Sequence, residues 1–217
     1  MALPLALCLS LMSGAGWAVT VEDATDCGDL ANPVFGPIDY RKANKQTRDL
    51  VESAHFTRGV ENLTRGKTGT FGWDIGYTLR AFPNHHRALL TMQRLVDLEK
   101  RNPARDAAYT IECYYDRALR FQPDDHVVRL LFANYLVEKK KADEAAKHLD
   151  YVSRVAADSP FTQFNVGMLF FDLKNYDRAL EQAHKALELG FTRPELADRL
   201  KSVGRWVEPP ASAASAP

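Results

Sequence analysis

The stretches "ADEAAKHLDYVSRVAADSP" (residues 142–160) and "YDRALEQAHKALELGFTRP" (residues 176–194) match each other at a spacing of 34 residues. Small residues recur at matching positions, as in the pair Ala145 and Ala179. A third copy of the pattern is "CYYDRALRFQP" (residues 113–123). Each copy has the apolar spacing of an amphipathic helix and ends at a proline. A fixed period of this length is typical of a protein built from stacked helical units.

A helix-turn-helix unit of 34 residues with small residues at fixed positions resembles the tetratricopeptide repeat (TPR) family. The resemblance covers about residues 73–191 and implies an all-α fold, a TPR-like α-solenoid of about three helix-turn-helix repeats. The stretch "TRPELADRLKSVGRW" is expected to form a C-terminal capping helix. The predicted segments are a signal peptide (1–18), an irregular and helical N-terminal extension (19–72), the solenoid with its capping helix (73–207) and a disordered Pro/Ala/Ser tail (208–217).

The first eighteen residues carry no charged side chain and end in Gly16-Trp17-Ala18, which places small residues where a signal peptidase requires them. We therefore expect a periplasmic or secreted protein, without a stable membrane span once the signal has been cleaved. Cleavage would leave two cysteines, Cys27 and Cys113. An even pair in an exported protein is compatible with one disulfide, and two free thiols are the alternative.

Composition and motifs argue against several functions. The 28 basic and 28 acidic residues balance, so the chain has no basic field for nucleic acid. Gly66-Lys67-Thr68 resembles the end of a phosphate-binding loop, but Glu61 stands where that motif requires glycine. The GxSxG and HExxH patterns are absent from the sequence. We therefore predict a protein that is not an enzyme, with no catalytic residue, no metal ligands and no cofactor.

The stretch "FPNHHRALL" (residues 82–90) contains two adjacent histidines, His85 and His86. We expect Pro83 to end one helix and Asn84 to cap the next, with the histidines in its first turn. An alternative hypothesis gives these residues a chemical role. In it, the N-terminal extension together with His55, His85 and His86 forms the site of a small-ligand or metal-binding protein, or of an enzyme.

The TPR resemblance implies that the first helix of each repeat faces a concave groove. The groove residues that it implies are Arg87, Leu90, Arg94, Asn134, Phe161, Phe164, Met168 and Phe171. The segment "FTQFNVGMLFFDL" (residues 161–173) has more large apolar residues than one helix face needs, so either a partner or the capping helix covers the surplus. The expected function is a non-catalytic protein–protein interaction scaffold or adaptor of the bacterial cell envelope, which binds a peptide or helix of a secretion, pilus or other envelope component in this groove.

Overall fold

The computed structural model describes residues 27–30 and 35–209 of the 217-residue chain. The predicted signal peptide and residues 210–217 of the predicted tail lie outside the described residues. Within those ranges the protein forms helices and no strands, which confirms the predicted all-α class. The helices are α1 (Lys45–His55), α2 (Arg58–Glu61), α3 (Phe71–Ala81), α4 (His86–Glu99), α5 (Ile111–Phe121), α6 (His126–Glu138), α7 (Ala142–Val155), α8 (Pro160–Asp172), α9 (Tyr176–Glu188) and α10 (Glu195–Ser202).

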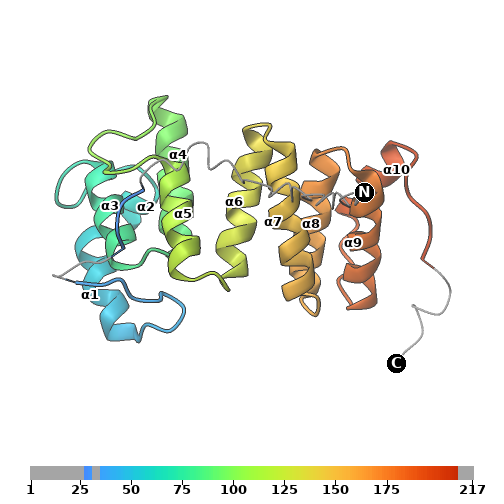
Figure 1. Cartoon of the computed structure of the whole chain (residues 1–217), viewed down its shortest axis with the longest axis horizontal. Coiled ribbons are helices and arrows are strands. Elements are labelled where there is room, and N and C mark those ends of the chain that lie inside the picture. Colours follow the sequence, from blue (N-terminus) through green and yellow to red (C-terminus); the bar gives the residue numbers. More distant parts are fainter. Residues whose placement is uncertain (1–26, 31–34, 210–217) are drawn as a thin grey trace, which may run out of the picture.

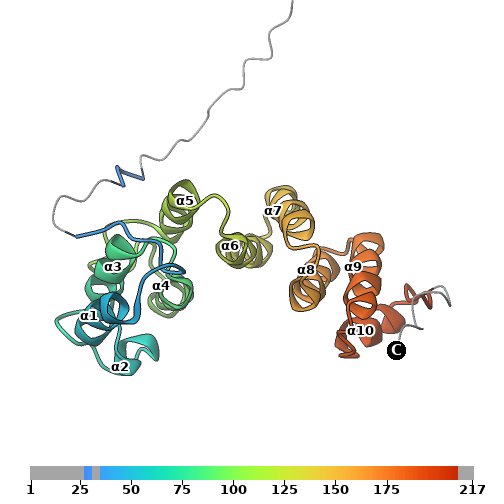
Figure 2. The same cartoon turned by 90° about the horizontal axis from the view of Figure 1, so that it is seen from below.

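The helices follow one another along the long axis of the molecule, and successive helices pack as pairs (Figure 1). The view along the helices shows α4, α6 and α8 on one side of this row and α5, α7 and α9 on the other (Figure 2). The row bends, and α4, α6 and α8 lie on the inside of the bend (Figure 2). The N-terminal helices α1 to α3 pack at one end of the row, and α10 packs against α8 and α9 at the other.

Small residues allow neighbouring helices to approach each other closely. A side-chain carbon added at Gly167 of α8 would lie 2.5 Å from Leu196 of α10 and 3.2 Å from Gln182 of α9. The equivalent position 34 residues earlier is Ala133 of α6, which is fully buried. Larger residues at these points would force the helices apart, and such overpacking destabilises a core.

The turns that join the first and second helices of two pairs have the same geometry. Lys140, after α6, has a φ of 61°, and Lys174, after α8, has a φ of 60°. The residue after each of them also makes an equivalent bond: the amide of Lys141 donates to the Leu136 carbonyl, and the amide of Asn175 donates to the Phe170 carbonyl. The backbone therefore repeats at the same 34-residue spacing as the sequence.

A disulfide joins Cys27 to Cys113 of α5, with an S–S distance of 2.05 Å and a sequence separation of 86 residues. Arg117, one turn further along α5, supports this junction by donating to the carbonyl oxygens of Cys27 (2.7 Å) and Asp29 (2.9 Å). The segment that contains Cys27 is thus fixed to the helical body by one covalent bond and by side-chain hydrogen bonds. Within the described residues, every helix is too short or too polar to span a bilayer.

Candidate functional site

The residues on α4 that are predicted to line a groove differ in how accessible they are. The guanidinium group of Arg87 lies between Glu52 of α1 (3.2 Å) and Glu61 of α2 (3.0 Å), so the N-terminal helices already neutralise it. Arg94 and Leu90 are exposed, Leu90 by 37%. A partner could therefore contact Leu90 and Arg94 directly, whereas contact with the Arg87 guanidinium would compete with its ion pairs to Glu52 and Glu61.

The groove residue on α6, Asn134, belongs to a polar seam between α4 and α6. Its amide donates to Glu138 (2.8 Å), whose other carboxylate oxygen accepts from Gln93 of α4 (2.9 Å). Lys139 and Asp97 form an ion pair of 3.0 Å across the same two helices. These contacts hold the two inner helices together and leave Asn134 half-buried.

Other residues of the protein cover most of the large apolar side chains of α8. Phe164 is only 9% exposed, and its ring centroid lies 4.9 Å from that of Phe191, in the loop before α10. The guanidinium of Arg199, on α10, lies 4.2 Å above the Phe171 ring and contacts the sulfur of Met168. By contrast, Phe161 is 59% exposed. Phe164, Met168 and Phe171 therefore pack within the fold, and Phe161 is the large apolar side chain that α8 presents to solvent.

The predicted cap of α4 is corrected by the structure. The residue that caps α4 is His85, whose Nδ1 accepts a hydrogen bond from the Ala88 amide (3.1 Å). Asn84 is fully buried and is engaged elsewhere: its amide donates to Asp39 (2.8 Å) and Asp125 (2.9 Å). The prediction was wrong because these partners lie 45 and 41 residues away from Asn84 in the sequence, where local capping rules do not reach.

The geometry around His85 fixes its protonation. Because Nδ1 accepts the Ala88 amide hydrogen, the ring proton lies on Nε2, which donates to Glu52 (3.2 Å). The ring also stacks on Tyr40, with centroids 4.0 Å apart, and is fully buried. This burial lowers the pKa of His85 below its ordinary value of 6.5. The imidazole is thus a neutral helix cap, which explains why a histidine is accepted at this position.

We predict that the free energy of unfolding falls as the pH drops from 7.5 to 5.5, partly because of His85. Because the pKa of His85 is lowered in the folded protein, the unfolded chain takes up this proton first as the pH falls. The contribution of the neutral imidazole to the free energy of unfolding is therefore present above pH 6.5 and is lost below it, by up to about 1.4 kcal/mol per pH unit. Urea unfolding at several pH values measures the slope. In a His85→Asn variant, which keeps a capping side chain, the slope should be shallower; an unchanged slope would contradict the neutral cap.

His86 has a different role from its neighbour. Its Nε2 lies 3.0 Å from a carboxylate oxygen of Asp125, the residue that caps α6 through the Val128 amide. Burial raises the pKa of Asp125, but hydrogen bonds from His86, Asn84 and the Val128 amide outweigh this and hold it below its usual value. The carboxylate is therefore ionised and joins α4 to α6.

The three histidines of the metal hypothesis are not brought together. His55 pairs with Asp74 (3.3 Å), His85 with Glu52 and His86 with Asp125. The described part of the chain has no group of three or more His, Cys, Asp or Glu side chains that could hold a metal ion. Each histidine instead connects two segments of the chain.

The loop that resembles a phosphate-binding motif binds a carboxylate of the same chain. The amides of Lys67 and Thr68 donate to Asp74 (2.8 and 3.1 Å), and the Thr68 hydroxyl also donates to it. Asp74 is fully buried in the first turn of α3. The amide groups that would cradle a phosphate are thus occupied by an internal anion.

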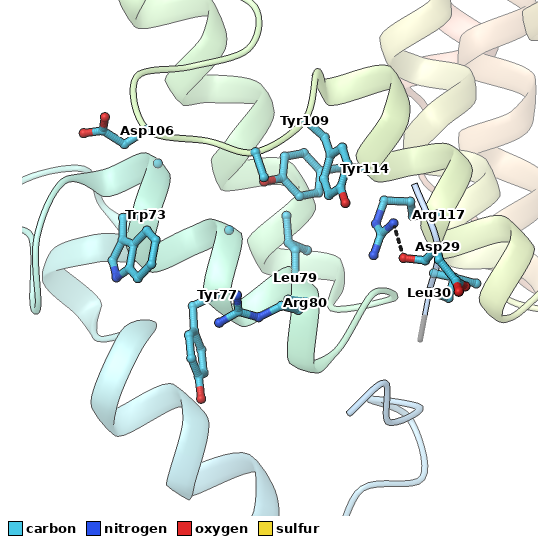
Figure 3. A pocket seen from close by; sticks show the side chains of 13 residues that line it. Asp29, Leu30, Trp73, Tyr77, Leu79, Arg80, Asp106, Tyr109, Tyr114 and Arg117 are labelled. Atoms are coloured by element: carbon cyan, nitrogen blue, oxygen red, sulfur yellow. Dashed lines mark hydrogen bonds between the residues drawn. The ribbon is translucent and has the colours of Figure 1, made fainter. Parts of the chain in front are cut away.

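A pocket that the sequence patterns did not predict lies between α3, α5 and the loop that precedes α5 (Figure 3). Its volume is about 260 Å³. The side chains that line it are those of Asp29, Leu30, Trp73, Tyr77, Leu79, Arg80, Asp106, Ala108, Tyr109, Tyr114 and Arg117. One signal is visible in the sequence: on α3, aromatic, glycine and arginine residues recur at helical spacing in "GWDIGYTLR" (residues 72–80), but the opposite wall comes from distant segments.

The comparisons with known proteins assign no family. A scan against protein-family models matches none, and a search of curated proteins finds no significantly similar sequence.

Proposed function

We propose that this protein is a TPR-like α-solenoid that acts as a non-catalytic scaffold in the bacterial cell envelope, binding a segment of a partner protein on its inner face. The observation that carries the proposal is the packing of α4, α6 and α8 side by side on the inside of the bend (Figure 2). The equivalent turns at Lys140 and Lys174 support a repeated unit. Stacked units of this kind provide extended concave binding surfaces.

The inner face suggests the chemistry of the partner. Its exposed groups include a cation, Arg94, and an apolar side chain, Leu90, on α4, and an aromatic ring, Phe161, on α8. Since α6 separates these helices, two interhelical spacings, roughly 20 Å, lie between the two ends. An extended segment of about six residues spans that distance. We therefore expect a peptide that carries an acidic residue near one end and a large apolar residue near the other.

Export is the second part of the proposal. The uncharged apolar stretch that ends at Ala18 supports it, and so does the Cys27–Cys113 disulfide, because disulfides persist in oxidising compartments such as the periplasm. A periplasmic or secreted location is consistent with a partner in a secretion, pilus or other envelope assembly.

Peptide selection tests the binding surface and does not require the partner to be identified first. A random peptide library displayed on phage would be selected against the purified protein, and affinities of the selected peptides measured by fluorescence anisotropy. We expect Arg94→Glu and Phe161→Ser each to weaken binding at least about ten-fold, the loss of one good contact. Both side chains are exposed, so both variants should fold.

The matched control is Lys147→Glu, an equally exposed charge reversal on α7, on the other side of the row. It should leave the affinity unchanged. Peptides that bind all three variants as tightly as the original protein, or a selection that yields no binding peptide, would contradict the assignment of the inner face.

A further inference from the structure

The pocket between α3 and α5 has walls made mainly of aromatic and cationic side chains. Trp73, Tyr77 and Arg80 come from successive turns of α3, and Tyr114 and Arg117 come from α5 (Figure 3). The α4, α6 and α8 face proposed above contributes nothing to its lining. At about 260 Å³ it is smaller than the roughly 300–1,000 Å³ sites that hold drug-sized molecules, so it fits a compound of one or two rings.

Gly76 leaves the helix surface open beneath one wall of the pocket. A side-chain carbon at this position would lie 3.1 Å from the Tyr114 hydroxyl, a tight contact, and this is the only neighbour it would meet within 4 Å among the described residues. Glycine inside a helix lowers its stability relative to alanine. The residue therefore weakens α3, and what it provides is room for the Tyr114 hydroxyl against the helix.

The Tyr114 hydroxyl is a buried donor without a partner. The residue is only 3% exposed, and although the backbone amides of Ala108 and Tyr109 lie close to its oxygen, the hydroxyl donates no hydrogen bond within the described part of the chain. Burial raises the pKa of Tyr114 to about 12, so the group stays protonated. An unpaired buried polar group is unfavourable, and a ligand with an acceptor atom would satisfy this one.

Two arginines, Arg80 and Arg117, line the pocket together with two aspartates, Asp29 and Asp106. The Arg80 guanidinium lies 4.6 Å from the Tyr77 ring centroid, and that of Arg117 lies 4.5 Å from the Tyr109 centroid. Neither forms an ion pair with a carboxylate among the described residues. Arg117 already donates to the Cys27 and Asp29 carbonyls, so the exposed Arg80 is the guanidinium whose N–H groups remain available to a carboxylate.

We propose that this pocket binds a small aromatic carboxylate, with its ring against the tyrosines and Leu79 and its carboxylate held by Arg80 and the Tyr114 hydroxyl. Two sources share this chemistry: a free aromatic acid and the C-terminal aromatic residue of a peptide. In both, the ring supplies apolar area to the aromatic walls, and the carboxylate supplies a counter-ion for Arg80 and an acceptor for the Tyr114 hydroxyl.

Calorimetric titration of the purified protein with 4-hydroxyphenylacetate and indole-3-acetate tests the proposal. We expect dissociation constants below about 1 mM, in the range of efficient small ligands. The neutral amides of the same acids should bind at least about ten-fold more weakly, because the charge-assisted hydrogen bonds are lost. The peptide Gly-Gly-Phe and its C-terminal amide form the second arm: preference for the free peptide over the single-ring acids would assign the site to a peptide terminus.

Two substitutions test whether the acids bind in this pocket. Arg80→Gln changes an exposed side chain, and Tyr114→Phe removes only the unpartnered hydroxyl, so both should fold with an unchanged or higher melting temperature. Each should weaken the binding of the acids at least about five-fold, whereas the exposed control Arg65→Gln should not. Equal affinity for acids and amides, no measurable binding of either arm, or binding that both pocket variants leave unchanged would overturn the proposal.

Discussion

Replacement of Asp125 by alanine is expected to lower the free energy of unfolding by about 3 kcal/mol, the cost of removing one partner of a buried ionic contact. Asp125 is 1% exposed and accepts hydrogen bonds from three groups: the Val128 amide, His86 Nε2 and the Asn84 amide. The variant therefore loses the cap of α6 and leaves buried donors without their acceptor. Urea unfolding followed by circular dichroism at 222 nm measures the effect.

The adjacent Asp124 provides a matched control. It is 69% exposed and pairs with Arg41 (3.0 Å) at the surface, where solvent screening leaves an ion pair with little effect on stability. Asp124→Ala should therefore have a small effect. Asp125→Asn, which keeps a capping oxygen, should fall between the two alanine variants. Equal costs for the two alanine variants would show that the buried contacts of Asp125 do not stabilise the fold.

Reduction of the Cys27–Cys113 disulfide is expected to lower the free energy of unfolding by about 2–4 kcal/mol. The bond closes a long loop, with a sequence separation of 86 residues, and so restricts the unfolded chain. In the reduced protein, side-chain hydrogen bonds such as those from Arg117 and Arg120 to carbonyls of residues 27–29 still hold this segment. Urea unfolding with and without a phosphine reductant measures the difference.

The double variant Cys27→Ser/Cys113→Ser separates the bond from other effects of the reductant. Without reductant it should unfold like the reduced original protein, and the reductant should not change it further. If the original protein unfolds at the same urea concentration whether or not it is reduced, the disulfide contributes nothing to stability.

The helical pairs are predictable because their signals are local. The 34-residue match at Ala142 and Tyr176 coincides with the first residues of α7 and α9. Apolar periodicity and the prolines between units depend only on near neighbours in the chain, so a single sequence carries them. The same holds for the small residues Ala133 and Gly167, because their positions in the 34-residue period indicate close contacts between helices.

The site residues are less predictable because their partners are distant. Whether Phe164 is exposed depends on Phe191 and on where α10 docks, which the apolar count of α8 does not reveal. The TPR resemblance predicts Arg87 as a groove cation, but Glu52 and Glu61 of the N-terminal extension form ion pairs with it. Sequence patterns identify which side chains are apolar or charged. They do not identify which other segment has already covered them.

The sequence by itself thus determined the all-helical class, the positions of the helix pairs and the small residues between them, because each follows from spacing along the chain. Only the tertiary structure decided that His85 is a neutral cap, that the Lys67 and Thr68 amides hold Asp74, and that a pocket with an unpartnered Tyr114 hydroxyl forms beside α3. These features depend on groups that approach each other through the folding of separate segments. The packing of those segments sets which groups pair, how deeply they are buried and how their charges interact. Short-range sequence patterns contain no information about that packing.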